Sequence, residues 1–568
     1  MQLSEQNGLP PLLGEILTAR GVAPHEAGAY LAPKLATSLP NPDSLQDMEK
    51  AATRLAHALM QKEKIAVFGD YDVDGASASA MLLDYMQACG VAARLYIPDR
   101  NQEGYGPNAP AMRQLADEGI QLVVTVDCGM MAHEALAAAR ECGLEVIVTD
   151  HHRAGASLPP ALAVVNPQRA DDTSGLTALA GVGVAFLLLV ATQARLSAAG
   201  AWQGKSKPDL LRCLDLVALG TVCDLVPLVG LNRAFVVQGL KVMARRERAG
   251  LAQLADLAGV QGRLDVQALG FWLGPRINAG GRVRRAEWGV ELLRTQDAAR
   301  ARELAEQLHG WNDERRALEA QTLAAAEAQL AVDAEKVPPF LLAVGEGWHK
   351  GVLGLVAARL KERWRRPAFV ASLDENGIAS GSARSLAGVN VGALIADATE
   401  SGALESGGGH AMAAGFRLTR AQLPRFRRWL ETALGDMPLE RIFAAARELK
   451  IDALADVDAC TRDLCEQVEA AGPYGSGNPE PRLVLAGAEV CWAEEAKGGH
   501  VRCQLRHRQG GTRLKAMAFQ RCDAQLRAQL LAGARQRDTR WHIAGHLRRD
   551  DWRNRQSVQF IIDDAAPA

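Results

Sequence analysis

Residues 64–75 read Lys64-Ile65-Ala66-Val67-Phe68-Gly69-Asp70-Tyr71-Asp72-Val73-Asp74-Gly75. The apolar first half has the length and composition of a buried strand, and it ends at three carboxylates spaced two residues apart. Carboxylates held this close raise one another's pKa unless cations neutralise them. The segment therefore predicts a buried strand that ends at a metal site.

The residues that follow alternate between two patterns. Short apolar runs predict strands at 93–98, 121–126, 144–149 and 161–165, and helical patterns between them predict crossover helices at 76–90, 107–118 and 130–142. Strands alternating with helices are typical of a parallel α/β sheet. Ligands bind such sheets beyond the carboxyl ends of the strands, which is where the three carboxylates are expected.

Further acids and histidines follow other apolar runs. Asp127 comes after one predicted strand, Asp150-His151-His152 after the next, and Asp224 after the apolar residues 219–222. One acid in such a place is more often a helix N-cap, whereas four such sites in register with the strand pattern indicate a metal site. Oxygen and imidazole ligands without thiolates suit Mn²⁺ or Mg²⁺ and argue against structural zinc. Such a set is large enough for two ions about 3.5–4 Å apart, as in phosphoryl hydrolysis.

Bulk properties exclude several classes of protein. The 568 residues carry a net charge of −2 and are 48% hydrophobic, which suggests three to four folded domains without a global basic field. The apolar stretch at 182–192 is too short to cross a membrane, and the first 20 residues do not resemble a secretory signal. The ten cysteines form no Cys-x-x-Cys pair, so reduced thiols and a cytoplasmic location are expected.

Pattern changes divide the chain into five expected parts. After a first α/β region, residues 286–333 are rich in helix formers, and a second α/β region has expected strands at 340–344, 368–373 and 378–385 and helices at 352–364, 391–399 and 420–434. The last part has short strand-like runs that predict a small β-barrel. The expected boundaries are 1–50, 51–285, 286–335, 336–440 and 441–568.

Three basic or glycine-rich segments are candidates for phosphate binding. Residues 274–285 read as a glycine-rich loop whose guanidinium groups could grip phosphate oxygens, although a solvated basic loop is the alternative. Gly407-Gly408-Gly409-His410 could form an anion-binding nest or only a tight turn. Residues 535–555 combine seven arginines with Trp541, His542, His546 and Trp552, a mixture suited to single strands unless it is merely a solvated face.

Taken in order, four of these motifs resemble the DHH superfamily of phosphoesterases: Asp70 to Gly75, Val126-Asp127-Cys128-Gly129, Asp150-His151-His152 and Thr221-Val222-Cys223-Asp224. Further segments resemble its single-strand-specific 5′→3′ DNA exonucleases, namely residues 103–106, 274–282, 348–354, 382–385, 407–410 and 472–480. The resemblance spans about residues 60 to 560. It implies an α/β fold with a DHH phosphoesterase domain at 51–285, a helical connector, a DHHA1 substrate-binding domain at 336–440 and an OB-like barrel at 441–568.

The resemblance also implies roles for individual residues. The implied shell of two Mn²⁺ or Mg²⁺ ions is Asp70, Asp72, Asp74, Asp127, His151 and Asp224, with Asp127 bridging. His152 is implied beside the scissile phosphate, and the implied catalytic group is His152, Asp127 and Arg276. The implied substrate contacts are Tyr105, Arg276, Asn278, Arg282, Arg384, Gly408, Gly409 and His410. Smaller members carry a histidine where this chain has Phe68, which leaves the shell of the first ion open.

The expected function is a metal-dependent exonuclease that degrades single-stranded DNA 5′→3′ to 5′-mononucleotides, in repair and recombination. Two rivals are a DHH phosphodiesterase acting on short oligonucleotides or cyclic dinucleotides, and a non-catalytic replication or repair scaffold. The helical connector and the barrel favour long strands, and the complete ligand set disfavours a scaffold. Single-strand-binding protein and helicases are candidate partners of an expected monomer without a membrane partner.

Overall fold

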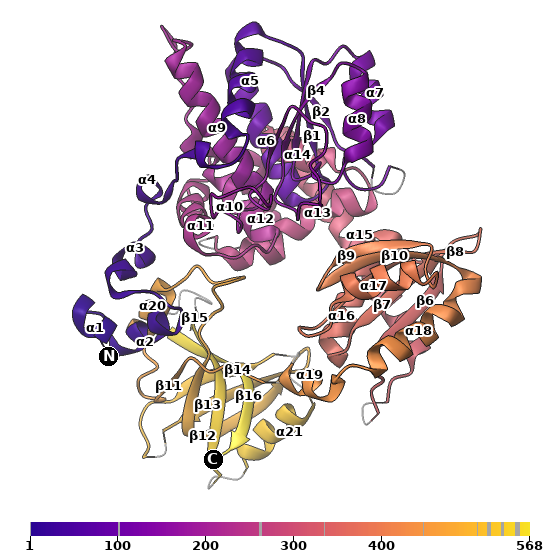
Figure 1. Cartoon of the computed structure of the whole chain (residues 1–568). Helices are drawn as coiled ribbons and strands as arrows, with labels where there is room; N and C mark the ends of the chain where they lie inside the picture. The colour runs from indigo at the N-terminus through magenta and orange to yellow at the C-terminus, as the bar shows by residue number, and fades with distance from the viewer. Residues whose placement is uncertain are drawn as a thin grey trace.

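The computed structural model describes residues 2–99, 103–260, 264–333, 336–446, 448–507, 509–519, 524–535, 539–550 and 557–568. These residues form three units, each built on one sheet, with one long helix leading from the first to the second (Figure 1). The combination of α/β units and a C-terminal barrel is the predicted fold class.

The first unit is built on an all-parallel sheet of order β2-β1-β3-β4-β5. Every strand predicted in this region is present within two residues at each end: β1 (Ile65–Gly69), β2 (Arg94–Tyr96), β3 (Leu122–Val126), β4 (Glu145–Thr149) and β5 (Ala163–Val165). Gly69 pairs with Val126, and Val126 with Thr149. Strands β1, β3 and β4 therefore end at the same level, and the residues after them emerge side by side.

Helices cover both faces of this sheet, which explains why its strands are almost continuously apolar. Alternate strand residues enter two different cores, with Val67 and Val124 in one and Ala66 and Val123 in the other. The smaller core is closed by α7 (Ala109–Asp117) and α8 (His133–Glu141). The larger core is closed by α5 (Met48–Gln61), α6 (Val73–Ala88), α9 (Gly181–Ala198), α10 (Leu214–Cys223), α11 (Gly230–Met243), α12 (Ala249–Leu257), α13 (Gly274–Val283) and α14 (Glu287–Arg294).

One helix of the larger core, α9, is long and apolar enough to cross a membrane, by length and composition alone. It is longer than the apolar stretch at 182–192 suggests. Two thirds of it is buried inside the structure, and its side chains from Val182 to Leu189 belong to the core. Its apolar character therefore has a full explanation in packing.

Two predictions about local structure in the first unit are wrong. Residues 219–222 are not a strand: they lie in α10, and Asp224 is the C-cap of that helix. Residues 274–283 are not a loop but helix α13, preceded by the π-helix η4 (Ala268–Leu273). Glycine is unfavourable inside a helix, yet a Cβ on Gly281 would come within 2.5 Å of the Tyr71 carbonyl oxygen. Its presence in α13 reflects this close packing.

The second unit follows the 33-residue helix α15 (Ala298–Leu330), which leads from the first unit to the second sheet (Figure 1). That mixed sheet has the order β6-β7-β8-β10-β9, with strands β6 (Leu341–Glu346), β7 (Ala368–Leu373), β8 (Ile378–Arg384), β9 (Ser406–His410) and β10 (Ala413–Thr419). Its helices are α16 (Leu353–Trp364), α17 (Val391–Glu400) and α18 (Leu423–Gly435). The glycine-rich residues predicted as a turn or nest instead form the edge strand β9.

The third unit is a closed barrel, since β12 pairs with both β13 and β15 in the order β12-β13-β14-β16-β15. Its strands are β11 (Ala453–Ala455), β12 (Leu483–Ala496), β13 (His500–Arg506), β14 (Leu514–Ala518), β15 (Trp541–Asp550) and β16 (Ser557–Pro567). Helices α20 (Arg462–Ala470) and α21 (Ala524–Gly533) accompany them, whereas α19 (Leu439–Ala445) packs against the core of the second unit through Leu439 and Ile442. Strand β11 adds to β12 in parallel, and within the closed ring only β14 and β16 pair in parallel. This pairing and the closure by β12 with β15 agree with the predicted OB-like barrel.

The N-terminal segment packs on two units: its first helices lie on the third unit, whereas Leu35 and Leu39 pack against the larger core of the first unit. It comprises α1 (Gln2–Asn7), α2 (Pro11–Ala19), α3 (Ala27–Leu31), α4 (Leu35–Ser38) and two short 3₁₀ turns. Leu13, Ile16 and Leu17 share a small core with Val468 and Ala471 beside α20. Figure 1 shows α1 and α2 beside α20.

Candidate functional site

The candidate site is built on the residues that follow β1, β3 and β4. Because these strands end in register, Asp70, Asp127 and Asp150 leave the same edge of the sheet. Asp127 adopts a left-handed backbone conformation with φ 59°, which is uncommon for a residue other than glycine. The Tyr105 hydroxyl donates a hydrogen bond of 3.1 Å to the Asp127 carbonyl oxygen. Tyr105 thus lies directly over the edge of the sheet.

The acids that follow Asp70 are held by helix termini. Asp72 caps α6, with its Oδ1 accepting from the backbone N–H groups of Asp74 and Gly75. Asp74 is buried, and its two oxygens accept from the backbone N–H groups of Gly181, at 2.6 Å, and Val182, at 3.0 Å. The N-terminus of α9 is therefore aimed at a carboxylate, an arrangement that the helix dipole favours.

Two glycines make room for this arrangement. A Cβ on Gly181 would lie 2.8 Å from Asp127 Cβ, and one on Gly220 would lie 2.6 Å from Asp74 Oδ1. Real Cβ atoms essentially never come so close to another heavy atom. The carboxylates can gather at this point because α9 and α10 each present a residue without a side chain.

Both histidines after β4 point into the site. His151 Nε2 lies 3.1 Å from Asp127 Oδ1 and 3.4 Å from Asp224 Oδ2. His152 Nδ1 lies 2.7 Å from Asp150 Oδ1, and its ring packs edge-on against Tyr105. Asp150 is itself buried and accepts a hydrogen bond from the Met130 N–H. The Asp150 carboxylate thus fixes the orientation of the His152 ring.

Ligand atoms gather in overlapping groups, each with its atoms within 4.8 Å of one another: Asp70, Asp72 and Asp127; Asp74, His151 and Asp224; Asp127, His151 and His152. We call the six residues Asp70, Asp72, Asp74, Asp127, His151 and Asp224 the carboxylate–histidine cluster. Asp127 belongs to two of the groups, as a bridging ligand would. Buried Asp127 Oδ1 and His151 Nε2 have no hydrogen-bond partner among the described residues. Such orphaned oxygen and nitrogen donors fit Mn²⁺ or Mg²⁺.

The protonation of the cluster reflects burial of like charges. Burial, together with the negative charge of neighbouring acids, raises the pKa of Asp74 to about 7 and that of Asp224 to about 9. The same causes raise the pKa of Asp127 well above its ordinary value. Burial lowers the pKa of His151 to about 4, which leaves that imidazole neutral and able to donate a lone pair to a cation. The cluster is thus a costly arrangement until cations neutralise it.

His152 differs from His151 in its charge. Burial disfavours its charged form, but the hydrogen bond and the negative charge of Asp150 outweigh burial and raise the pKa of His152 to about 9. His152 is therefore a cation at neutral pH. A cation beside the cluster suits a phosphate oxygen better than it suits a metal ion.

Phe68 belongs to the smaller core of the first unit. Its ring is buried and stacks on that of Tyr96 at a centroid distance of 5.1 Å. Phe68 offers no ligand atom to an ion. The carboxylates of Asp70, Asp72 and Asp127 lie close enough together to hold an ion without a histidine at position 68.

The basic residues of α13 have partners within the protein. Arg276 is buried, and its Nε donates to His309 Nδ1 at 3.1 Å and its Nη1 to the Trp272 carbonyl oxygen at 2.7 Å. Asn278 Oδ1 accepts from the Val73 N–H, and Arg282 Nη1 donates to the Gly351 carbonyl oxygen. Asn278 thus supports the loop of Asp72, and Arg282 joins the first unit to the second.

The predicted residues of the second unit lie at the ends of neighbouring strands. Arg384 is the last residue of β8 and pairs with Ala413, the first residue of β10. Ala413 pairs on its other side with His410 of the exposed edge strand β9. Gly408 and Gly409 precede His410 on that strand. Partial burial and the positive charges of His152 and Arg153 lower the pKa of His410. The end of β9 therefore faces the cluster closely enough for His152 to influence it.

The predicted strand-binding surface on β15 is corrected in part. Trp541 is buried in the barrel core, so it offers no ring for stacking. Arg540, Arg548 and Arg549 form ion pairs with Glu489, Glu480 and Glu469, respectively. Trp552, Arg537, Arg553 and Arg555 lie outside the described residues. Exposed aromatic rings of the barrel are instead those of Trp492 and Phe519.

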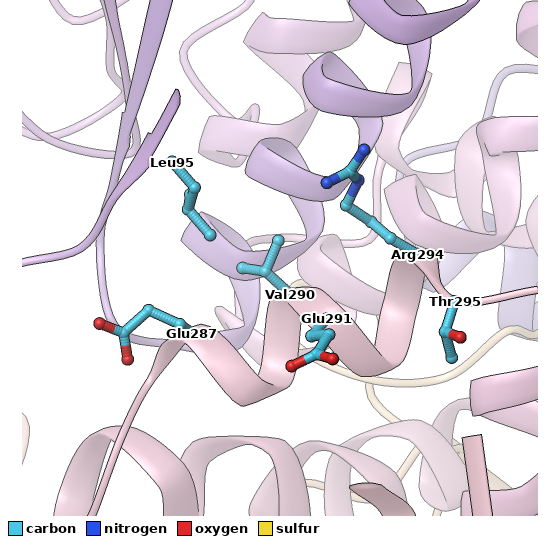
Figure 2. Close-up of a pocket in the computed structure, with 6 residues that line it drawn as sticks. All are labelled: Leu95, Glu287, Val290, Glu291, Arg294 and Thr295. Carbon is cyan, nitrogen blue, oxygen red and sulfur yellow. The ribbon is translucent and has the colours of Figure 1, made fainter. Parts of the chain in front are cut away.

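The first unit also contains a cavity of about 450 Å³ between the edge strand β2 and α14 (Figure 2). It is lined by Leu95, Glu287, Val290, Glu291, Arg294 and Thr295. No predicted site residue is among these described lining residues.

Sequence reasoning gave no role to several residues of the site. Asp150 lies at a strand end like Asp127, so the signal that identified Asp127 was available for it. Gly181 carries no local signal, because its close approach to Asp127 joins segments more than 50 residues apart. His309, the partner of Arg276, lies within the predicted helical connector and carries no local signal.

Three family models match consecutive parts of the chain. They are the DHH family, N-terminal domain at residues 64–221, the DHHA1 domain at 337–436 and the RecJ OB domain at 451–564.

Curated relatives are similar over almost the whole chain. The single-stranded-DNA-specific exonuclease RecJ of Escherichia coli is 33% identical over 572 residues, covering 98% of this chain and 96% of its own length. That of Bacillus subtilis is 34% identical over 567 residues, covering 99% of this chain and 69% of its own. A crystal structure of Thermus thermophilus RecJ in complex with Mn²⁺ matches 99% of this chain and 77% of its own, with a TM-score of 0.81 and 31% identity.

Proposed function

Because this chain belongs to the RecJ family of single-stranded-DNA-specific exonucleases, we propose that it degrades single-stranded DNA 5′→3′ and releases 5′-mononucleotides. It is a metal-dependent phosphodiester hydrolase that acts in DNA repair and recombination. The observation that carries the proposal is the carboxylate–histidine cluster, in which the two orphaned atoms of Asp127 and His151 face each other at 3.1 Å.

We assign the six residues of the cluster to two divalent ions, with Asp127 as the bridge. The three overlapping groups of donors support this assignment. When bound, Mn²⁺ or Mg²⁺ supplies Lewis acidity and lowers the pKa of a water molecule for attack on phosphorus.

Residues of this chain would bind and orient the phosphodiester around that water. His152, held by Asp150 through Nδ1, presents a positive charge to a non-bridging phosphate oxygen, where charge grows in the transition state. Arg276 is assigned to the same task, with its guanidinium oriented by His309. Tyr105, which is half exposed above the Asp127 carbonyl, is assigned to the nucleotide next to the scissile bond.

We assign the remaining substrate contacts to the part of the DNA strand that leads to the carboxylate–histidine cluster. Asn278 and Arg282 lie on α13, and Arg384, Gly408, Gly409 and His410 lie on the second sheet. The influence of the His152 charge on His410 supports a path for the strand between the first and second units. On the barrel, stacking is assigned to Trp492 and Phe519, since exposed rings tolerate any base.

We assign the domain boundaries at 51–285, 286–335, 336–440 and 441–568, after an N-terminal segment at 1–50. The three matched ranges lie within the assigned DHH, DHHA1 and OB-like parts. A cytoplasmic monomer that works with single-strand-binding protein and helicases is part of the same proposal.

The activity can be tested with Mn²⁺ and single strands labelled at the 5′ or the 3′ end, beside a duplex and a cyclic dinucleotide. The proposal expects mononucleotides from the 5′ end of single strands and little product from the duplex. Preferential turnover of the cyclic dinucleotide would contradict this proposal and support a phosphodiesterase. Binding of single-stranded DNA without cleavage would support a non-catalytic scaffold.

The first prediction concerns the bridging ligand. Asp127→Ala should lower the rate of cleavage by more than about 100-fold, because even outer-shell partners of a metal ion cost 10–100-fold. Affinity for single-stranded DNA, measured by fluorescence anisotropy, should stay within about twofold, since the assigned strand contacts are untouched. The exposed carboxylate Asp397, changed to Ala, is the matched control and should leave both quantities unchanged.

A further inference from the structure

The segment at 472–480, Gly472-Pro473-Tyr474-Gly475-Ser476-Gly477-Asn478-Pro479-Glu480, has no role in the proposed chemistry. It joins α20 to β12 of the third unit, yet it contacts the first unit beside the cluster. The Leu228 N–H donates a hydrogen bond of 2.7 Å to the Ser476 carbonyl oxygen. Leu228 lies only four residues after the assigned metal ligand Asp224.

The close approach of the two segments depends on glycine. A Cβ on Gly475 would lie 2.8 Å from Leu228 Cδ1, the flexible end of a side chain. A Cβ on Gly477 would lie 2.7 Å from Pro227 Cβ and 3.1 Å from Pro227 Cα, atoms of a rigid ring. Any side chain at position 477 must therefore displace the backbone between Asp224 and Leu228.

That backbone has little freedom to absorb a displacement. Asp224 is the C-cap residue of α10, and its Oδ2 lies 3.4 Å from His151 Nε2. The next residue, Leu225, has a left-handed backbone conformation with φ 60°. Buried Asn232 donates from Nδ2 to the carbonyl oxygens of Pro227 and Ala178. The Asp224–Leu228 stretch is thus held by Asn232 on one side and by the 472–480 segment on the other.

The 472–480 segment is itself held rigidly by Asn478. This buried amide donates to the carbonyl oxygens of Ala471 and Pro473 and accepts from the hydroxyl of Tyr30 and from Arg20. The segment is therefore a fixed support and not a mobile loop that could yield to Pro227.

We infer that the 472–480 segment is a positioning element for Asp224. Through this segment, the position of the third unit against the first sets the affinity of the carboxylate–histidine cluster for its ions. The inference rests on the proposed function, since it takes Asp224 as a metal ligand. Groups that only hold a ligand in place cost 10–100-fold in metal affinity when they are disturbed.

The decisive variant is Gly477→Ala, and its matched control is Gly487→Ala. Both glycines lie in the third unit with almost the same backbone strain, φ 68° and φ 64°, but a Cβ on Gly487 meets no heavy atom within 4 Å. Mn²⁺ affinity is measured without DNA, by calorimetric titration and by the electron paramagnetic resonance of free Mn²⁺. Gly477→Ala should weaken binding by about 10-fold, and Gly487→Ala should leave it unchanged.

The Asp224→Asn background separates positioning from a general loss of stability. There, Gly477→Ala should cause no further loss of Mn²⁺ affinity, because the residue that it displaces no longer ligates. Equal Mn²⁺ affinity of Gly477→Ala and wild type would overturn the inference, as would equal losses in the two backgrounds.

Gly475→Ala provides a second test if Gly477→Ala does not fold, because the end of the Leu228 side chain can move. It should weaken Mn²⁺ binding by a few-fold, and an unchanged affinity would contradict the inference. Since these measurements need no cleavage, a failure of the nuclease assay would not be confused with a failure of the positioning role. In the cleavage assay, saturating Mn²⁺ should restore the rate of Gly477→Ala.

Discussion

At the scale of single residues, the site is a set of charges that only cations make compatible. His151 and His152 are neighbours in sequence and yet carry opposite pKa shifts, to about 4 and to about 9. The difference arises because His152 has Asp150 as a hydrogen-bond partner, whereas His151 Nε2 has no hydrogen-bond partner among the described residues. One imidazole can therefore serve an ion and the other a phosphate.

The charges also predict how the metal-free protein responds to pH. Asp224 and His152 have folded-state pKa values of about 9, above their ordinary values, so the folded protein holds more protons than the unfolded chain between pH 6.5 and 9. The free energy of unfolding should fall as pH rises through this window. His151, with its lowered pKa, has its opposite effect only below about pH 6.5.

Thermal unfolding in the presence of a chelator tests this expectation. The melting temperature should decline between pH 6.5 and 9, and saturating Mn²⁺ should remove most of the decline by taking the place of the protons. Asp224→Asn should make the decline shallower, whereas Asp397→Asn, an exposed carboxylate, should not. A melting temperature that rises across this window would contradict the assignment.

At the scale of secondary-structure elements, the sequence was informative where a local pattern is sufficient. Strands β1, β3 and β4 could be predicted because both of their faces are buried and most of their residues are apolar. Helix α13 and strand β9 could not, because their glycines follow from distant contacts. A Cβ on Gly407 would lie 2.4 Å from Ile395 Cγ2, a residue of another element. Similarly, Asp224 was predicted as an acid of the site, but not that a helix carries it.

The meeting of α9 with the end of β3 gives an element-scale prediction. Gly181→Ala places a methyl group 2.8 Å from Asp127 Cβ, so either the helix or the bridging carboxylate must move. We expect the rate of cleavage to fall by about 10–100-fold, with a matching loss of Mn²⁺ affinity in calorimetric titration. Gly183→Ala, on the same helix, would come closest to the end of the Leu179 side chain, at 3.2 Å, and would make ordinary contacts of 3.7 Å with Leu179 Cβ and the Phe235 ring. It should remain close to wild type, and equal effects of the two variants would argue for a general effect on α9.

At the scale of the whole molecule, Arg233 joins three parts of the chain. It is buried on α11, donates to the carbonyl oxygens of Tyr30 and Ala471, and lies over the Tyr30 ring at 4.1 Å. The N-terminal segment, the first unit and the third unit are thereby bound through one guanidinium group. No pattern near residue 233 in the sequence indicates this, because its partners are about 200 residues away in both directions.

Loss of this guanidinium group should loosen the third unit. Arg233→Met leaves the part-buried Tyr30 carbonyl without its arginine donor, whereas the Ala471 carbonyl keeps the Asn478 amide as a donor. The loss should cost about 1–3 kcal/mol and lower the midpoint of thermal unfolding. Limited proteolysis should also cut more quickly between residues 436 and 482. Arg212→Lys replaces an exposed arginine whose ion-pair partner Glu247 is also exposed, so it should shift stability by no more than about 0.5 kcal/mol. Equal cleavage rates for the two variants would contradict the role of Arg233.

The shared core of α2 and α20 has a consequence for how the chain folds as it is made. Leu13, Ile16 and Leu17 leave the ribosome first, but Val468 and Ala471, which cover them, are synthesised more than 450 residues later. During most of translation this apolar surface of α2 has no partner from its own chain. Helix α2 therefore lacks this partner until α20 has been synthesised, and only then can the two helices form their shared core.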